Sequence, residues 1–503
     1  MMKVKLSTEA IAAIATDCLI VTYCEDQDTL KGHAKTVDSA LDHRISQLIA
    51  EKEIKGKFGE VTLLHNWGKI PAKRTIVLGL GKEAELTVDK VRDAVGIAAR
   101  HAQKKGVRNL TFGVADYYVQ RSLWNPVDIV QSVVEGVELG TYVFVGYKKQ
   151  TDPVPAIEEF TLVVEEGMGK SAVEAGFHRA DVMAYSTNLA RDLVNEPGNK
   201  MTPAILADRA RSIARNHNLE ITVLNKAELE ELGMGALLGV GQASVNEAKM
   251  IVLKYHGAPD SREVLGLVGK GVTFDTGGIQ VKPDEGMGEM KTDMAGAAAV
   301  LAAMDGIGAL QPHVNVIAVM PTCENMIGGN NLKPADVITS FSGKTIEIVH
   351  TDAEGRLILA DGVAYAKHLG ATKLVDVATL TGSVVSALGH AATGMITNNE
   401  EWIDEVKVAA RIAGEKMWQL PNFEEYQEYI KSDIADIKND AGRPAGCIQG
   451  GIFIGAFAED TPWVHLDIAG TAIVDKDRGH HPEGATGVAV RTLIQLAIRF
   501  GGK

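Results

Sequence analysis

Four acidic residues in the C-terminal half of the chain lie beside long apolar runs. Asp275 directly follows the run VGKGVTF, and Asp293 directly precedes the apolar residues 294–304. Asp352 and Glu354 precede a third apolar stretch. Carboxylates at close range repel one another, and each buried ion without a partner costs several kcal/mol. Such a group needs cations, and two divalent ions would balance the four negative charges.

The spacing and the surroundings of these carboxylates favour a shared metal site. Asp352 and Glu354 are two residues apart, which directs both side chains to one side of an extended segment. Three cationic residues belong to the same segments: Lys270, Lys282 and Arg356. Ligand sites of α/β sheets gather at the ends of strands and helices. The combination therefore predicts a two-metal centre with hard oxygen ligands, which suit Mg or Mn and also accept Zn.

Each of these residues taken alone also fits a purely structural role. Asp275 could form the turn after a strand, and Asp293 could cap the helix that follows it. Thr351 and Glu354 have the spacing of a capping box. The three cations could be ordinary solvated charges. The structural role is the better explanation for any single residue, and only the combination favours chemistry.

The elements that must position these residues follow an α/β pattern. Up to about residue 166, short apolar runs alternate with segments of helical periodicity such as residues 88–103. A helix is predicted at residues 171–194, after a segment with two prolines at 148–157. Strands are predicted at 18–24, 61–66, 74–81, 109–116 and 160–166, and then at 221–225, 249–255, 263–274, 314–321, 345–350, 373–380 and 463–470.

This alternation predicts an α/β fold with two domains. Residues 1–166 form a smaller N-terminal α/β domain, residues 167–195 a connecting helix, and residues 196–503 a larger C-terminal α/β domain. The larger domain has a mixed central sheet flanked by helices.

Composition excludes several classes of protein. The 503 residues carry a net charge of -14, so nucleic acid and anionic membrane surfaces are not expected partners. Four cysteines without a C-x-x-C pair indicate a reducing compartment. No signal peptide is recognisable, and the apolar run at 294–304 is shorter than the roughly 20 residues that a bilayer requires. We therefore expect a cytoplasmic protein.

Two glycine-rich turns resemble phosphate-binding loops, but their spacing argues against both. Gly79 and Gly81 are followed by residues 99–101, which offer no acidic partner for a ribose. The pair Gly269-Lys270 is followed by Gly271 where a Walker A loop has Ser or Thr. A nucleotide site is not predicted.

The string HTDAEGRL at residues 350–357 resembles the hallmark NTDAEGRL of the leucyl aminopeptidase (cytosol aminopeptidase) family. The blocks VGKGVTFDTGG and EMKTDMAGAAAV resemble the family's first catalytic block. Further similar strings are NEPGN at 195–199, DVATLTG at 376–382 and HLDIAGTA at 465–472. The resemblance is strong over about residues 190–495 and weaker over the first 165, where only the α/β pattern supports it.

The resemblance implies a ligand set for two divalent ions, most readily Mn or Zn, with Mg or Co as further options. One ion is then held by Lys270, Asp275, Asp293 and Glu354. The other is held by Asp275, Asp352 and Glu354, together with the carbonyl of Asp352. A lysine can bind a metal only as the neutral amine, which a pair of metal ions favours.

The resemblance also implies the catalytic roles. The two ions activate a water molecule, Lys282 polarises the scissile carbonyl and stabilises the gem-diolate, and Arg356 holds a bicarbonate ion as general base. The catalytic domain would be the C-terminal one, and the assembly a homohexamer.

The expected reaction is the release of N-terminal amino acids, preferably leucine and other apolar residues, from peptides. A free α-amine can bind a metal as a neutral ligand, whereas an internal amide nitrogen does so poorly. The family's apolar side-chain pocket corresponds here to four residues: Met290, Thr379, Leu380 and Gly382. Core packing is the alternative role for these four.

His350 departs from the family pattern, which has Asn at this position. In an extended segment His350 would point to the same side as Asp352. We hypothesise a hydrogen bond that orients the Asp352 carboxylate, against the alternative that the imidazole only packs.

Two other functions remain as alternatives. The chain could be a catalytically inactive relative that acts as an interaction or nucleic-acid-binding regulator, although the intact acidic and basic residues argue against lost catalysis. It could also be another two-metal hydrolase such as a phosphoesterase, but no clustered Arg or His residues suit phosphate.

Overall fold

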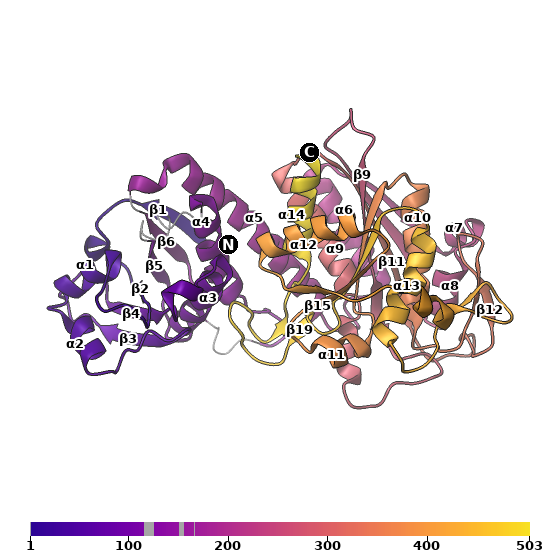
Figure 1. The fold of residues 1–503 in the computed structure, drawn as a ribbon, viewed down its shortest axis with the longest axis horizontal. Coiled ribbons are helices and arrows are strands. Elements are labelled where there is room, and N and C mark those ends of the chain that lie inside the picture. The colour runs from indigo at the N-terminus through magenta and orange to yellow at the C-terminus, as the bar shows by residue number, and fades with distance from the viewer. Residues whose placement is uncertain (1, 115–124, 150–154, 165, 503) are drawn as a thin grey trace. The chain divides into compact units, whose positions relative to one another are not determined.

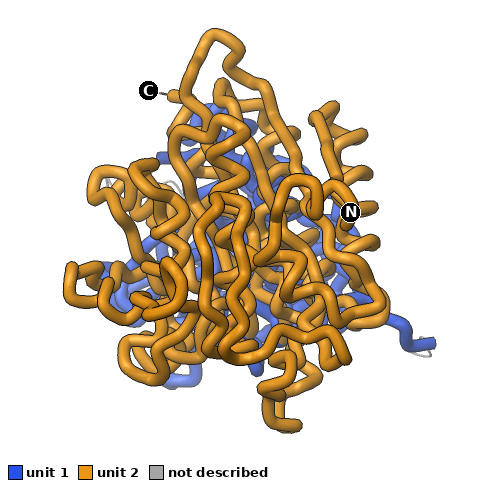
Figure 2. Tube along the Cα trace, turned by 90° about the vertical axis from the view of Figure 1, so that its right-hand side faces the viewer, with its two compact units in different colours: residues 1–185, 474–483 blue, residues 186–473, 484–503 orange. Residues whose placement is uncertain are grey.

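The structure is a computed structural model that describes residues 2–114, 125–149, 155–164 and 166–502. The chain divides into two compact units, coloured separately in Figure 2. One comprises Met1–Tyr185 with Val474–Glu483, and the other Ser186–Ile473 with Gly484–Lys503. The division falls within helix α5 (Lys170–Asn195). The domain boundaries at residues 166 and 195 stay a prediction, and residues 150–154 of the proline-containing segment lie outside the described residues.

The N-terminal unit is built on a six-stranded sheet in the order β1-β6-β5-β2-β4-β3, which Figure 1 shows in indigo and purple. All neighbours are parallel except β3 and β4. The strands are β1 (Lys3–Ser7), β2 (Cys18–Tyr23), β3 (Val61–His65), β4 (Arg74–Gly79), β5 (Asn109–Val114) and β6 (Glu159–Val164). The helices are α1 (Gly32–Ala40), α2 (Arg44–Ala50), α3 (Val88–Lys104) and α4 (Pro126–Gly140).

Alternate residues of β2 explain why both faces of this sheet are covered. Ile20 belongs to a core that also contains residues of α3 and α4. Leu19 and Val21 belong to a second core with residues of α1 and α2. A strand that is apolar on both faces is typical of a parallel sheet between two helical layers. Strand β1 was not predicted, because its edge sequence KVKLS is largely exposed.

The C-terminal unit has a larger sheet in the order β16-β15-β18-β14-β9-β11-β8-β7, with β10 paired to β11. Parallel pairs occupy its centre, and β8 and β15 each join it in antiparallel fashion, so the predicted mixed sheet is confirmed. Its strands are β7 (Glu220–Leu224), β8 (Lys249–His256), β9 (Val264–Gly269), β10 (Gly271–Asp275), β11 (Asn315–Asn325), β14 (Lys373–Ala378), β15 (Thr393–Thr397), β16 (Met417–Gln419) and β18 (Trp463–Asp467).

The other strands of the described residues form two small sheets. One contains β12 (Val337–Thr339), β13 (Thr345–Glu347) and β17 (Ile437–Lys438), and the other contains β19 (Ile473–Val474) and β20 (Gly484–Ala485).

Helices cover both faces of the large sheet (Figure 1). Helices α8 (Gly235–Gly241), α10 (Glu354–His368) and α13 (Gly446–Ala458) pack on one face. A second group packs together around α9: α6 (Pro203–His217), α9 (Ala295–Leu310), α12 (Glu400–Ala413) and α14 (Val490–Gly501). The other α-helices among the described residues of this unit are α7 (Lys226–Glu231) and α11 (Gly382–Leu388).

Helix α9 is the most apolar helix of this second group. The charge-free run 294–304 lies inside a longer segment, Met287–Leu310, which within the described ranges is long and apolar enough to cross a membrane by length and composition alone. However, 89% of its most apolar window is buried inside the protein. Burial of this kind is typical of a core helix, and it explains why residues 295–304 can be apolar on every side.

Candidate active site

The residues of the site lie where parallel strands end and helices begin. Lys270 follows β9 directly, and its backbone N–H donates to the Val377 carbonyl of β14 at 3.0 Å. The first turn of α9 lies against the same strand ends. A Cβ added at Gly296 would come within 2.0 Å of the Val377 oxygen, so only glycine permits this approach. The close approach positions Asp293, which lies just before α9.

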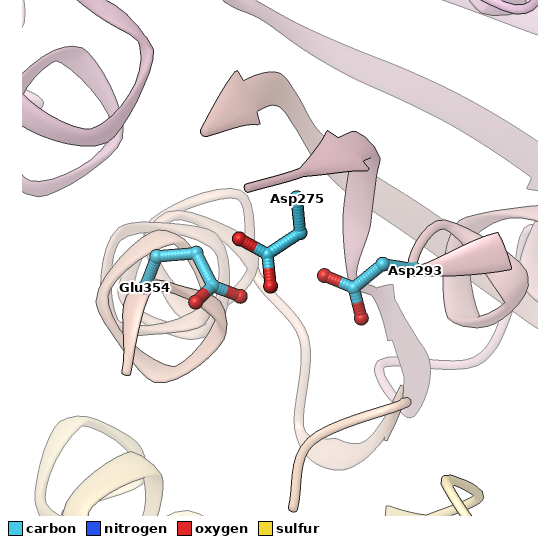
Figure 3. Close-up of side chains that lie close together, drawn as sticks. All are labelled: Asp275, Asp293 and Glu354. Carbon is cyan, nitrogen blue, oxygen red and sulfur yellow. The ribbon is translucent and has the colours of Figure 1, made fainter. Parts of the chain in front are cut away.

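Three buried carboxylates converge at this edge of the sheet. Asp275 ends β10, Asp293 precedes α9, and Glu354 begins α10. Figure 3 shows their carboxylate groups pointing toward one another, and one oxygen from each lies within 4.8 Å of the others. Segments about 80 residues apart in the sequence therefore contribute to one acidic cluster.

Two lysines are in direct contact with the acidic residues. Lys270, only 2% exposed, places Nζ 2.7 Å from Asp293 and 2.9 Å from Glu354. Lys282 places Nζ 2.8 Å from Asp275 and 2.5 Å from Asp352. Burial disfavours both ammonium groups, but the surrounding carboxylates outweigh burial and raise the pKa of each lysine. The two lysines hold the four carboxylates together.

The acidic residues still outnumber the cations that touch them. Burial raises the pKa of Asp293, Asp352 and Glu354, and neighbouring carboxylates add to the effect. Among the described residues, Asp293 Oδ2 and Glu354 Oε2 are buried and accept no hydrogen bond. Buried oxygens of this kind need an explanation, and an excess of converging hard oxygen donors fits divalent cations.

Amide and hydroxyl groups orient Asp275 and the neighbouring loop. Asp275 Oδ1 accepts from the Gly277 N–H at 2.9 Å and from Asn325 Nδ2 at 2.8 Å. Asn325 also donates to the Thr351 carbonyl at 3.2 Å. Asn325 was not predicted from the sequence, because its only signal is its place at the end of β11.

The structural roles considered for single residues have mixed outcomes. Asp275 does form a turn, through its bond to Gly277. Asp293 is not the N-cap of α9, because Met294 occupies that position. The capping box is also absent, because Thr351 Oγ1 donates to the Gly277 carbonyl and accepts from the Gln280 N–H.

Arg356 is buried on the first turn of α10. Its Nη1 donates to the Asn439 carbonyl at 2.6 Å, and Asp440 lies 3.9 Å away. Its Nε is buried and, in the part of the chain that the structure describes, has no hydrogen-bond partner. Burial lowers the pKa of this guanidinium. An incompletely paired buried guanidinium fits a small anion.

The hydrogen bond of His350 to Asp352 differs from the one hypothesised from the sequence. His350 Nδ1 accepts from the backbone N–H of Asp352 at 3.1 Å, so this hydrogen bond fixes the backbone of Asp352 and not its carboxylate. An Asn side-chain oxygen commonly accepts a hydrogen bond from the N–H two residues on. His350 therefore makes the contact that the family's Asn could make.

A cavity of about 450 Å³ opens beside the acidic cluster. All four residues predicted for the side-chain pocket line it: Met290, Thr379, Leu380 and Gly382. The metal-ligand candidates and Lys282 line it as well. Further apolar lining comes from four residues that were not predicted from the sequence: Val385, Ala469, Ala472 and Ile473. Three of these lie in or beside the string HLDIAGTA.

Comparisons with known proteins agree with this geometry. The model of the cytosol aminopeptidase family, catalytic domain, matches residues 188–494, and that of the family's N-terminal domain matches residues 20–151. A protein of Alkaliphilus metalliredigens (strain QYMF) named "Probable cytosol aminopeptidase" is 46% identical over 503 residues, with 99% of each chain covered. A namesake from Alkaliphilus oremlandii (strain OhILAs) is 45% identical, with 98% of this chain and 99% of its own covered.

Solved structures show the same likeness. A mutant of tomato leucine aminopeptidase matches with a TM-score of 0.88 and 32% identity, covering 99% of this chain and 97% of its own. The bottromycin maturation enzyme BotP in complex with Mn matches with a TM-score of 0.82 and 32% identity, covering 97% and 100%. These matches support an aminopeptidase, a hydrolase of the metal-dependent kind. The chain belongs to the cytosol aminopeptidase family.

Proposed function

We propose that this aminopeptidase uses two divalent ions to release N-terminal leucine and other apolar residues from peptides. The observation that carries the proposal is the excess of converging carboxylates over lysines, with two buried oxygens left without a partner among the described residues, on the wall of a partly apolar cavity.

The proposed ligand set follows the acidic cluster. Asp275, Asp293 and Glu354 would hold one ion together with Lys270, whose ammonium proton the incoming ion would displace so that the neutral amine binds. Asp275, Asp352, Glu354 and the Asp352 carbonyl would hold the other. When bound, the ions would supply Lewis-acid chemistry that activates a water molecule at neutral pH. Mn is favoured by its presence in the related BotP complex, with Zn, Mg and Co as alternatives.

Lys282 is the proposed electrophilic group. Its side chain is 21% exposed and lines the cavity, so Nζ can reach a carbonyl oxygen of a bound peptide. A positive group at that position would stabilise the negative charge that develops on the oxygen. Lys282 also neutralises part of the negative charge of Asp275 and Asp352. These ion pairs keep its side chain oriented when no peptide is bound.

Arg356 is the proposed holder of a bicarbonate ion that acts as general base. Its guanidinium is buried and positively charged, and its Nε is not bonded to any described residue. A bicarbonate there would accept a proton from the attacking water. The arginine itself would only bind and orient this anion.

The cavity has an apolar part and an acidic part, and together they would select peptides with an apolar N-terminal residue. Met290, Leu380 and Val385 supply apolar surface, and Met adapts to side chains of different shape. The free α-amine of the peptide would lie at the acidic end. The intact lysines, arginine and carboxylates disfavour an inactive regulator.

Two further expectations belong to this proposal. The relatives are named cytosol aminopeptidases, which supports a soluble protein of the cytoplasm. We also propose a homohexamer, which analytical ultracentrifugation would test through the mass of the assembly.

A direct assay tests the proposed function. The protein is treated with a chelator, dialysed, and supplied separately with Mn, Zn, Co or Mg before leucine anilide is added. We expect activity to disappear with the chelator and return with a metal, and N-acetyl-leucine anilide to remain intact because its amine is blocked. Absence of hydrolysis with every metal would refute the proposal.

A further inference from the structure

We infer that Asn439 is a positioning residue for the catalytic centre. It acts on the acidic loop, defined here as residues 349–353, and on Arg356. The inference rests on the proposed function, since it concerns Asp352, a proposed metal ligand, and Arg356. Asn439 lies 83 residues after Arg356 in the sequence and belongs to none of the segments that carry the catalytic residues.

The backbone brings Asn439 beside the acidic loop. Strands β13 and β17 pair in parallel, with Glu347 opposite Lys438. Asn439 follows β17 directly, and its N–H donates to the Glu347 carbonyl at 3.0 Å, which extends the ladder by one bond. The acidic loop leaves β13 at the same point. Asn439 is only 1% exposed.

The side chain of Asn439 uses its full hydrogen-bonding capacity on this loop. Oδ1 accepts from the N–H groups of Val349 at 2.7 Å and His350 at 3.2 Å. Nδ2 donates to the carbonyls of His350 at 2.7 Å and Ala353 at 3.4 Å. A carboxamide offers two donors on one atom and an acceptor on the other. Asp would lose the donors, and an apolar residue would lose every one of these bonds.

The backbone carbonyl of Asn439 also binds Arg356. It accepts the 2.6 Å hydrogen bond from Arg356 Nη1. One buried residue therefore fixes the loop that presents Asp352 and the guanidinium proposed to hold the general base.

The rest of the loop is held from the opposite side. The N–H of Thr351 donates to Gln280 Oε1 at 2.7 Å, and its carbonyl accepts from Asn325. Loss of the Asn439 side chain would leave the bonds to Gln280 and Asn325 intact and remove the bonds on the other side of the acidic loop. The loop would therefore tilt rather than unfold. Displacement of reacting groups by about 1 Å can lower a rate by about 100-fold. Removing groups that orient metal ligands typically lowers metal affinity or activity by about 10- to 100-fold.

The matched control is Asn315, another buried asparagine that holds a loop. At the first position of β11, its Nδ2 donates to the carbonyls of Ala258 and Ser261, and its Oδ1 accepts from the Ala258 N–H. Asn325 and the site lie at the opposite end of the same strand. Truncation of either asparagine removes comparable buried hydrogen bonds, but only one of them lies at the site.

The experiment compares Asn439→Ala with Asn315→Ala in the full-length enzyme loaded with Mn. We expect both to lower the melting temperature. Only Asn439→Ala should lower kcat for leucine anilide, by about 10- to 100-fold with little change in KM. The same variant should raise the Mn dissociation constant by a similar factor. Asn439→Asp keeps the shape and the acceptor, so it provides the same comparison if the alanine variant does not fold.

Each outcome has one meaning. Asn439 variants with the kcat and Mn affinity of Asn315→Ala would overturn the inference, because Asn439 would then serve stability alone. A wild-type enzyme that binds no Mn or hydrolyses no anilide would instead refute the proposed function. The wild type is therefore measured first.

Discussion

Each unit of the protein buries a group of charges, and the two groups are built on different principles. In the N-terminal unit, Arg92 Nε lies 2.6 Å from Glu135, and its Nη1 lies 2.7 Å from Asp89. Gln131 donates to the second oxygen of Glu135 at 2.6 Å. Burial disfavours the guanidinium charge, but Glu135 and Asp89 outweigh it and raise the pKa of Arg92.

The catalytic unit differs in how well its carboxylates are satisfied. In both networks the carboxylates outnumber the contacting cations two to one, but Asp89 of the first is 47% exposed to solvent, whereas Asp275, Asp293 and Glu354 of the second are all buried. Burial raises the pKa of Asp293, Asp352 and Glu354. Two of the buried carboxylate oxygens accept no hydrogen bond from any described residue. The folded chain thus concentrates negative charge that its own groups leave partly uncompensated.

The difference separates a structural ion network from a functional one. A buried network that satisfies its own members stabilises the fold. One that leaves carboxylates unsatisfied lowers stability unless a ligand compensates it, which is typical of sites shaped for function. The comparison predicts that substitutions in the first network change stability alone, whereas those in the second change ion binding and turnover.

The largest effect should come from Asp275→Asn in the acidic cluster. This residue is a proposed ligand of both ions, and metal stabilisation of a transition state is worth several kcal/mol. Since about 1.4 kcal/mol is tenfold in rate, kcat/KM should fall by about 10³-fold or more. The neutral amide relieves repulsion, so the melting temperature without metal should hold or rise. Steady-state kinetics and calorimetry measure both. Retained activity would remove the distinction between the two networks.

In the N-terminal network, Arg92→Met should change stability and nothing else. The substitution leaves Glu135 buried without its cation, which typically costs about 3–5 kcal/mol. Urea unfolding of the N-terminal unit, followed by circular dichroism, should report this loss. Mn affinity and kcat should match the wild type, and a loss of Mn binding would show that the network is not purely structural.

Lys282→Met should separate turnover from ion binding within the catalytic unit. The lysine is proposed to stabilise charge on the substrate, and loss of such a donor typically lowers kcat by about 10²- to 10³-fold. Mn should remain bound, and more tightly, because a competing positive charge has gone. Steady-state kinetics measures the expected fall in kcat, and a titration with Mn measures the expected gain in affinity. Parallel loss of Mn and activity would assign Lys282 to ion binding.

The smallest expected effect concerns His350. His350→Asn keeps an acceptor for the Asp352 N–H and should retain kcat within about twofold, whereas His350→Ala loses it and should lower kcat by about tenfold. Equal rates for the two variants would mean that this hydrogen bond has no influence on catalysis.

Sequence patterns predicted the α/β layers and most strands, because buried parallel strands form continuous apolar runs such as residues 18–23. They also predicted the acidic cluster, since Asp275, Asp293 and Glu354 all stand at the ends of such elements. The exposed edge strand β1 lacks that signal.

The supporting amides could not be predicted in the same way. The side chains of Asn325 and Asn439 bond to groups 26 to 90 residues away in the sequence, so their roles appear only when the strands have been paired. The bond of His350 to the backbone was missed for a related reason. Strand periodicity does not apply to residues 349–353, which follow β13 as a loop.

The number of Mn ions bound per chain is the most direct test of the central claim. Native mass spectrometry of the wild-type protein, after chelation and reloading, counts them without reference to activity. The uncompensated acidic cluster predicts two ions per chain in the wild type and fewer in Asp275→Asn. A wild-type chain that binds one ion or none at saturating Mn would contradict the account.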